Sequence, residues 1–385
     1  MRMTIFLSVF ITLYGSLHFL AFWMARRAFQ FHKGVAVPLG LFMGGMVVCP
    51  ILVRMVERQG MESLARVLAY VGYTWMGFLF LFVAAALFLD IYRGVVFLVS
   101  LATGRRSING KLSPKAVFFL CLGTALVLGV YAQIEAIGIQ TEHIVIKSPK
   151  IPKEVGRFRI VQISDVHLGL IMGRKQLLRI LNVVRAAKPD ILVSTGDLLD
   201  GQVDGIEDLA AEFQEIKPPY GKYAVNGNHE YYVGIERARK FCKTAGLTLL
   251  INETFDIPGI LVIAGVDDLT ANRFGHYGKL PEKQLLSKWP TDRFVVVLKH
   301  RPLLDEASKG LFDLQLSGHT HRGQIFPFTL LIKMLYPIDA GLLELATGGF
   351  LYVNPGSGTW GPPMRFLAPP EVTVIDLVHG KRENS

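Results

Sequence analysis

The sequence predicts a protein in two parts, a multi-pass α-helical membrane region followed by an α/β domain. Long apolar runs fill the first third of the chain, and the mean hydropathy over all 385 residues is +0.38. In the remainder, short β-rich runs alternate with stretches of helical periodicity, which is typical of an α/β domain. Histidine, aspartate and asparagine residues directly follow five of the predicted strands.

Four apolar runs without a charged residue predict the membrane helices. Each is close to the roughly 20 residues that a helix needs to cross a bilayer core. A fifth run, residues 94–104, is too short to span and is expected to extend the third helix or to lie at the membrane interface. The four predicted spans are residues 3–24, 34–53, 67–89 and 116–134.

The positive charge of the chain lies between these spans. Residues 1–140 hold 12 of the 41 Lys and Arg but only 4 of the 31 acids, a net charge of +8, whereas the rest of the chain carries +2. A nucleic-acid groove needs its cations on the folded domain, so this distribution gives no support to nucleic acid as a partner. Cytoplasmic loops are enriched in Lys and Arg, and eight of the twelve lie in or beside the first and third loops. This predicts an integral protein of the cell membrane whose C-terminal domain is extracytoplasmic.

The region after the last span begins with a linker in which Pro149 and Pro152 mark a break. The predicted organisation is 1–136 for the membrane helices, 137–155 for the linker and first strand, and 156–385 for the α/β domain. Predicted helices cover residues 176–187, 206–216 and 235–245. Predicted strands cover residues 158–164, 191–194, 223–225, 260–264, 294–298, 314–316 and 372–377.

The polar groups that follow five of these strands have the composition of a metal site. Ligands bind outside the carboxyl ends of strands in an open α/β sheet, so all five groups are expected at one edge. Carboxylate, amide and imidazole groups are suitable ligands for Mn, Fe or Zn, and in an extended D-x-H or H-x-H run both side chains can reach one ion. Glycine beside the ligands permits tight turns. The groups are Asp165-Val166-His167, Gly196-Asp197-Leu198-Leu199-Asp200, Gly227-Asn228-His229-Glu230, His300 and Gly318-His319-Thr320-His321.

These five motifs, in this order, resemble the signature of the calcineurin-like metallophosphoesterase superfamily. The run Arg322-Gly323-Gln324 and residues 356–365 are similar to those of its membrane-attached bacterial members. The resemblance covers about residues 140–380 and implies an α/β/β/α sandwich with two divalent ions, Mn, Fe or Zn. It implies that Asp165, His167 and His321 hold one ion, that Asn228, His300 and His319 hold the other, and that Asp197 bridges both.

The same resemblance assigns His229 as the histidine that is not a ligand and that stabilises the transition state or protonates the leaving oxygen. Glu230 is expected to orient His229, while Asp200 either supports the site or stabilises a turn. Arg322, where many relatives have Gly, either reaches a substrate phosphate or points to solvent.

The implied function is hydrolysis of phosphodiester, phosphomonoester or pyrophosphate bonds by a metal-bridging hydroxide. The membrane helices favour lipid or envelope substrates, with membrane lipids and the phosphoester as partners; no pattern indicates an oligomeric state. Two alternatives remain, a cytoplasm-facing hydrolase of a nucleotide-linked lipid precursor and a non-catalytic membrane sensor of metal or phosphate.

The apolar segment 326–350, directly after the last motif, also has two interpretations. It packs against the domain core, or it forms a cap or membrane-facing flap that guides an amphiphilic substrate to the metals.

Overall fold

A computed structural model describes residues 2–104, 112–201, 206–276 and 281–381. The chain separates into two compact units, Met1–Ile134 with Gly361–Met364, and Glu135–Trp360 with Arg365–Ser385. No sequence pattern indicated that residues 361–364 cluster with the helices. Arg105, Arg106 and Lys111 of the predicted cytoplasmic loop lie outside the described residues.

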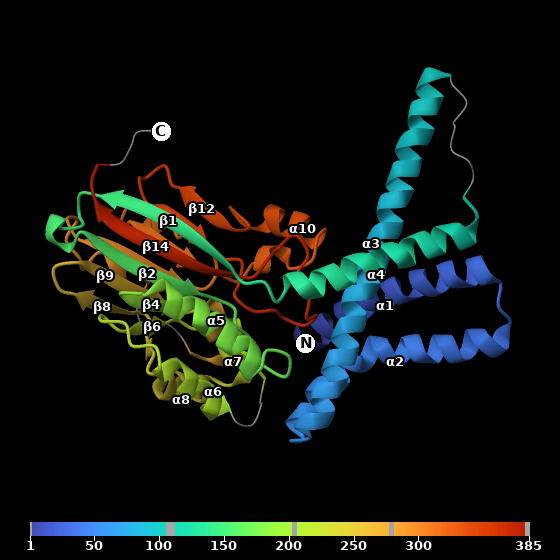
Figure 1. The fold of residues 1–385 in the computed structure, drawn as a ribbon, viewed down its shortest axis with the longest axis horizontal. Helices are drawn as coiled ribbons and strands as arrows, with labels where there is room; N and C mark the ends of the chain where they lie inside the picture. The colour runs from blue at the N-terminus through green and yellow to red at the C-terminus, as the bar shows by residue number, and fades with distance from the viewer. Residues whose placement is uncertain (1, 105–111, 202–205, 277–280, 382–385) are drawn as a thin grey trace. The chain divides into compact units, whose positions relative to one another are not determined.

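The helical unit contains four helices that are long and apolar enough to cross a membrane, which confirms the four predicted spans. The fifth apolar run continues the third helix, which therefore has 42 residues and a length of about 63 Å. That length is about twice the hydrocarbon core of a bilayer. The helices are α1 (Arg2–Phe29), α2 (Lys33–Arg58), α3 (Glu62–Thr103) and α4 (Pro114–Glu135) (Figure 1).

A buried histidine joins α1 to α3. The indole Nε1 of Trp75 donates to Nε2 of His18 at 2.9 Å, and Nδ1 of His18 donates to the carbonyl of Tyr14 at 2.9 Å. Both ring nitrogens therefore have partners, and the imidazole acts as a polar contact between helices. Gly72 of α3 lies so close to Cys49 of α2 that a side chain at position 72 would overlap the sulfur.

The second unit is built on two six-stranded sheets, shown as arrows in Figure 1. The first sheet has the order β1-β14-β2-β4-β6-β7 and the second the order β12-β13-β11-β10-β9-β8. The strands of the first sheet are β1 (Gln140–Ser148), β14 (Glu371–His379), β2 (Arg157–Ile163), β4 (Ile191–Ser194), β6 (Lys222–Ala224) and β7 (Thr248–Leu249). Those of the second are β12 (Gly341–Glu344), β13 (Phe350–Val353), β11 (Leu314–Ser317), β10 (Phe294–Lys299), β9 (Leu261–Val266) and β8 (Glu253–Ile257). A short pair, β3 (Leu168–Gly169) and β5 (Leu199–Asp200), is separate.

Three apolar layers hold the domain together. Ile160 of the first sheet and Ile263 and Val296 of the second belong to one core cluster between the sheets. Alternate residues such as Val161 face helices on the outer side of the first sheet. The second sheet is covered on its outer side by α9 and neighbouring turns. The result is the predicted α/β/β/α sandwich, with α5 (Arg174–Ala187), α6 (Ile206–Gln214) and α8 (Ile235–Ala245) on one side and α9 (Glu282–Leu286) on the other.

All predicted strands and helices of this domain are present within two residues at either end. Elements that the sequence pattern did not predict are short or lie at sheet edges. They include β8, β12 and β13 of the second sheet, α7 (Asn228–Val233) and α10 (Phe328–Leu335).

Candidate metal centre

The predicted ligands follow the carboxyl ends of parallel strands that belong to two different sheets. Strands β2, β4 and β6 run parallel in the first sheet, and β10 and β11 run parallel in the second. The expectation of one edge of one open sheet was therefore wrong. Face-to-face packing brings two edges together, and groups from both sheets form the site.

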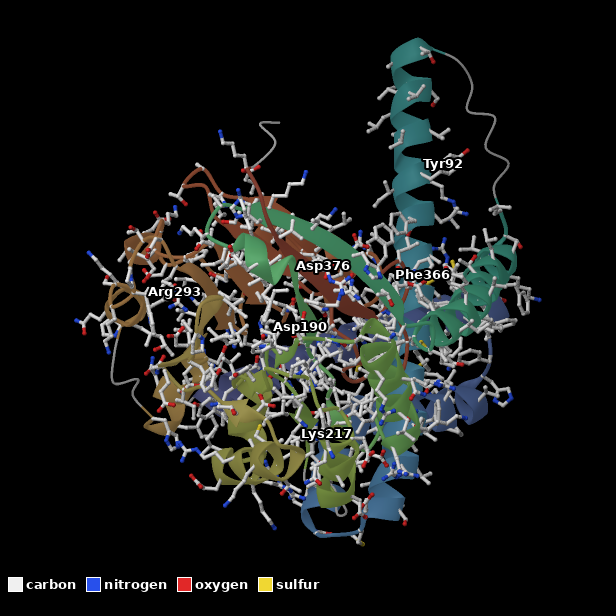
Figure 2. All side chains as sticks on the ribbon, turned by 60° about the vertical axis from the view of Figure 1, so that its left-hand side comes forward. Tyr92, Asp190, Lys217, Arg293, Phe366 and Asp376 are labelled. Atoms are coloured by element: carbon white, nitrogen blue, oxygen red, sulfur yellow. The ribbon has the colours of Figure 1, made fainter. Side chains whose placement is uncertain are left out.

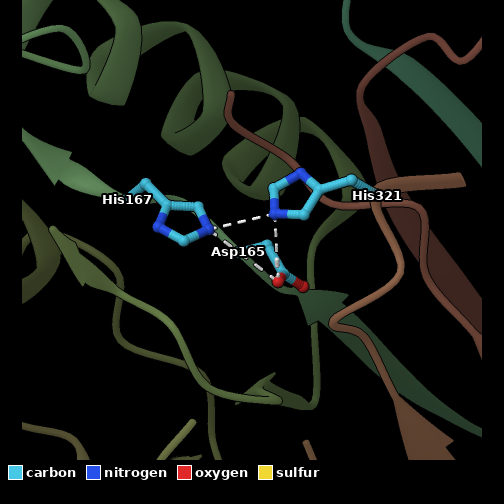
Figure 3. Close-up of side chains that lie close together, drawn as sticks. All are labelled: Asp165, His167 and His321. Carbon is cyan, nitrogen blue, oxygen red and sulfur yellow. Dashed lines mark hydrogen bonds and ion pairs between the residues drawn. The ribbon is translucent and has the colours of Figure 1, made fainter. Parts of the chain in front are cut away.

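The first cluster contains Asp165, His167 and His321 (Figure 3). Nε2 of His321 lies 3.4 Å from Oδ1 of Asp165 and 3.0 Å from Nε2 of His167. Both Oδ1 of Asp165 and Nδ1 of His167 are buried without a hydrogen-bond partner among the described residues. Oδ1 of Asp165, which faces the two imidazoles, is thus available to a bound cation.

The second cluster contains Asp197, His300 and His319. Oδ2 of Asp197 lies 3.3 Å from Nε2 of His300 and 3.8 Å from Nε2 of His167, so this carboxylate reaches both clusters. Nδ1 of His300 donates to the carbonyl of Thr195 at 2.8 Å, which orients the ring so that Nε2 faces the cluster. Nε2 of His300 is in turn 3.0 Å from Nδ1 of His319.

Asn228 joins the second cluster through an arginine that sequence reasoning missed. Arg301 has Nη2 at 3.4 Å from Oδ1 of Asn228 and Nη1 at 3.2 Å from Nε2 of His319. Its Nε donates to Asp268 at 2.8 Å, which fixes the guanidinium in place. The signal in the sequence was an arginine directly after the His300 motif at a strand end.

Five of the seven predicted ligands have a left-handed backbone. Positive φ angles are uncommon for residues other than glycine and concentrate at functional sites. The expectation that D-x-H and H-x-H lie on extended backbone was wrong, because each of these turns immediately after its strand. His319 and His321 consequently enter different clusters. The five angles are 51° for Asp165, 54° for His167, 53° for Asp197, 72° for His319 and 48° for His321.

Two of the glycines for which tight turns were predicted make room for the carboxylates. A Cβ at Gly227 would overlap Oδ1 of Asp197, and a Cβ at Gly318 would overlap Oδ2 of Asp165. The third predicted glycine, Gly196, has a φ of 97°.

His229 lies beside both clusters and is oriented by Asp200. Its Nδ1 is 3.0 Å from Oδ1 of Asp200, and its ring centroid is 4.6 Å from that of His167. The expectation that Glu230 orients His229 was wrong. The Glu230 carboxylate instead accepts hydrogen bonds from the backbone N–H groups of Gly227, Asp197, Leu198 and Leu199. It therefore ties two ligand loops together.

The charges of the site favour cation binding. Burial lowers the pKa of His167 and of His319 to about 3, so these imidazoles are neutral. Burial acts in the same direction on His300, but Asp197 and other carboxylates outweigh it and raise its pKa to about 10. For His229, burial is likewise outweighed, first by Asp197, and the pKa rises to about 9. Protons on two histidines thus offset the carboxylate charge, a role that divalent cations can take over.

The residues present fit a pair of divalent ions. Oxygen and imidazole donors converge in two groups that share Asp197, and one carboxylate oxygen, Oδ1 of Asp165, accepts no hydrogen bond from the described residues. The described cysteines, Cys49, Cys121 and Cys242, take no part, so the donor set is the one that suits Mn, Fe or Zn.

Comparison with known proteins identifies the family. The model of the calcineurin-like phosphoesterase family matches residues 158–323, which include all seven predicted ligands and His229. A metallophosphoesterase of Aquifex aeolicus is 40% identical over 255 residues, which are 66% of this chain and 97% of that protein. The chain belongs to the calcineurin-like metallophosphoesterase family.

Two other metallophosphoesterases are similar beyond the catalytic motifs. One from Campylobacter jejuni is 32% identical over 316 residues, 80% of this chain and 83% of the relative. A transmembrane protein with a metallophosphoesterase domain from Danio rerio is 34% identical over 275 residues, 67% of this chain and 62% of the relative.

Proposed function

We propose that this metallophosphoesterase is a membrane-tethered hydrolase of phosphoric esters that uses two divalent ions. The observation that carries the proposal is the geometry of Asp197, whose carboxylate lies within 4 Å of a histidine from each cluster. One ion would be held by Asp165, His167 and His321, the other by Asn228, His300 and His319, with Asp197 serving both. Bound there, the ions supply Lewis acidity and lower the pKa of a water molecule.

His229 serves as the proton donor to the leaving oxygen. Asp200 accepts from its Nδ1, which holds the ring in one orientation and favours the protonated imidazole. Its ring packs edge-on to Tyr232 and Trp360, both about half exposed, so the histidine lies at an aromatic border of the site.

Arg301 binds a non-bridging oxygen of the phosphoryl group. Its guanidinium contacts Asn228 and His319 and its side chain is 25% exposed, so it presents a fixed positive charge at the second cluster. A planar fork of donors is suited to phosphate.

Hydrolysis of bis(p-nitrophenyl) phosphate by the full chain loaded with Mn²⁺ tests the proposal. We expect turnover, and we expect Asp197→Asn to lower it by about a thousandfold, because the carboxylate common to both clusters is neutralised. Asp313→Asn is a matched control: Asp313 is buried at the start of β11, the strand whose other end precedes His319. Full turnover by Asp197→Asn would contradict the proposed role of this carboxylate.

We further propose that the catalytic domain is extracytoplasmic, on the basis of the Lys and Arg in the first and third loops. A reporter pair fused to the C-terminus tests this. Activity of a periplasmic reporter is expected, and activity of a cytoplasmic reporter would favour the cytoplasm-facing hydrolase instead.

A further inference from the structure

The helix that follows the last ligand motif has an apolar face that the described residues leave exposed. In α10, five of eight residues are large apolar side chains that are exposed to between 44% and 82%: Phe328, Leu330, Leu331, Met334 and Leu335. Only Thr329 of this helix is buried. The expectation that segment 326–350 packs against the core was therefore wrong for α10. Exposed apolar surface of this extent marks a site of interaction.

The chemistry of this face fits lipid better than protein. Phe328, Leu331 and Leu335 recur at helical spacing on one side, and the single charge in α10 is Lys333. Helices that lie in a membrane interface have such a face of Leu and Phe. The residues that dominate binding at protein interfaces are most often Trp, Tyr and Arg, and α10 contains none of these.

The chain also keeps this domain within reach of a bilayer. The last helix able to cross a membrane, α4, ends at Glu135, and β1 begins at Gln140. Four residues lie between them and span at most about 14 Å. A domain held by so short a tether cannot leave the membrane surface.

Two hydrogen bonds connect the segment around α10 to the ligand loop. Oγ1 of Thr329 donates to the carbonyl of Arg322 at 2.8 Å, and Oγ1 of Thr320 donates to the carbonyl of Asp339 at 2.6 Å. Directly after α10, the ring of Tyr336 packs edge-on to His319 with centroids 5.8 Å apart. The apolar helix is thus fastened at both of its ends to the loop that supplies His319 and His321.

We propose that α10 inserts its exposed face into a phospholipid bilayer and that the site takes phosphoesters whose alkyl or acyl chains remain among the lipids. The apolar tail then lies along α10 while the phosphoryl group reaches the metal ligands on the adjoining loop. The substrate class rests on the proposed function, whereas the insertion of α10 does not.

Lipid-borne quenching tests the insertion without any catalysis. The full chain is placed in phosphatidylcholine nanodiscs that contain nitroxide-labelled acyl chains, with an environment-sensitive dye on Met334→Cys. The native cysteines are all buried. Phe255→Cys is the matched control, because Phe255 is an exposed apolar residue on β8 of the same domain. We expect quenching at position 334 and none at 255; equal quenching at the two positions, or none at 334, would overturn the insertion.

Two substrates, one with and one without a long alkyl chain, test whether α10 guides lipid-anchored phosphoesters to the metal ligands. We expect Leu331→Asp with Met334→Asp to lower kcat/KM for p-nitrophenyl hexadecyl phosphate in nanodiscs about tenfold more than for bis(p-nitrophenyl) phosphate, because two apolar side chains no longer enter the lipid. Phe255→Asp should leave the ratio unchanged. Equal losses on both substrates would overturn the delivery role. Failure of the unaltered protein to hydrolyse either ester would instead reject the proposed function, while the quenching result would still decide the insertion.

Discussion

The two ends of β2 hold buried charge in opposite ways. Near its start, the guanidinium of Arg159 donates two hydrogen bonds of 2.7 Å to the Asp376 carboxylate and one of 2.8 Å to the carbonyl of Ala187. The backbone N–H of Arg159 also donates to the Asp190 carboxylate at 2.7 Å. Figure 2 labels Asp190 and Asp376. Just after its end, Asp165 is fully buried, and Oδ1 of its carboxylate accepts no hydrogen bond from the described residues.

This difference distinguishes an ion pair that supports the fold, Arg159 with Asp376, from a carboxylate of the candidate site, Asp165. A charge whose hydrogen-bonding capacity is met by the protein stabilises the fold, whereas a buried charge that is left partly unsatisfied costs stability unless a ligand completes it. The left-handed backbone at Asp165 and His167 lies at the same end as the unsatisfied atoms. We infer that the carboxyl end of β2 is built for ion binding at the expense of metal-free stability.

The largest effect expected from this comparison is that of Asp165→Asn. Loss of one carboxylate from the first cluster should lower phosphodiesterase turnover by about a hundredfold or more, as expected when an electrostatic group of the site is lost. The metal-free variant should nevertheless melt at or above the temperature of the metal-free parent, because an unsatisfied buried charge is removed.

Steady-state kinetics of the metal-loaded proteins and calorimetry of the metal-free proteins measure the two effects. A large fall in the melting temperature of metal-free Asp165→Asn would show that this carboxylate stabilises the fold, and the contrast between the two ends of β2 would not hold.

A smaller effect is expected from Asp200→Asn, which changes a positioning residue and no ligand. With its partner neutral, His229 loses the orientation and the charge that favour its protonated form, so kcat should fall about ten- to a hundredfold. The metal content and KM should stay unchanged. If the variant also loses bound metal, the role of Asp200 is to support the ion sites and not to orient His229.

Arg301→Met should weaken the binding of the phosphoester substrate. Because the guanidinium is proposed to contact the phosphoryl group, KM should rise about tenfold, which corresponds to one charge-assisted hydrogen bond. Arg293→Met is a matched control: Arg293, labelled in Figure 2, is 26% exposed against 25% for Arg301 and pairs with Asp256 of β8, which carries no predicted ligand. Steady-state kinetics of both variants measure the difference. An unchanged KM with a lowered kcat would assign Arg301 to the positioning of Asn228 and His319.

The smallest effect on activity is expected at the satisfied end of β2. Asp376→Asn should leave turnover unchanged and lower the free energy of unfolding of the domain by about 2 kcal/mol, because Arg159 loses a charge-assisted partner. The hydrogen bond from Arg159 lowers the pKa of Asp376, so the contribution is present above the unfolded pKa of about 4 and is lost as the pH falls through the lower folded pKa. Denaturant unfolding at pH 7 and pH 3 should show the difference between parent and variant shrinking with acidification.

Several parts of the molecule could be predicted because their signals are local. The spans α1 to α4 follow from uninterrupted apolar runs, and β4 and β10 are apolar up to their last residue, as is typical of buried parallel strands. Other elements lack such a signal. β8 has only two apolar residues, Phe255 and Ile257, and β12 has only four residues at a sheet edge, so neither contains a long apolar run.

By itself, the sequence determined the four membrane-spanning helices, the strands and the ligand types at the strand ends, because each depends on neighbouring residues in the chain. The tertiary structure decided which of those residues meet. His319 and His321 are two positions apart and enter different clusters, while Asp200, and not the adjacent Glu230, orients His229. Only the fold showed that Arg301 reaches the second cluster and that α10 is left exposed. These facts depend on the packing of two sheets, which short-range sequence patterns do not encode.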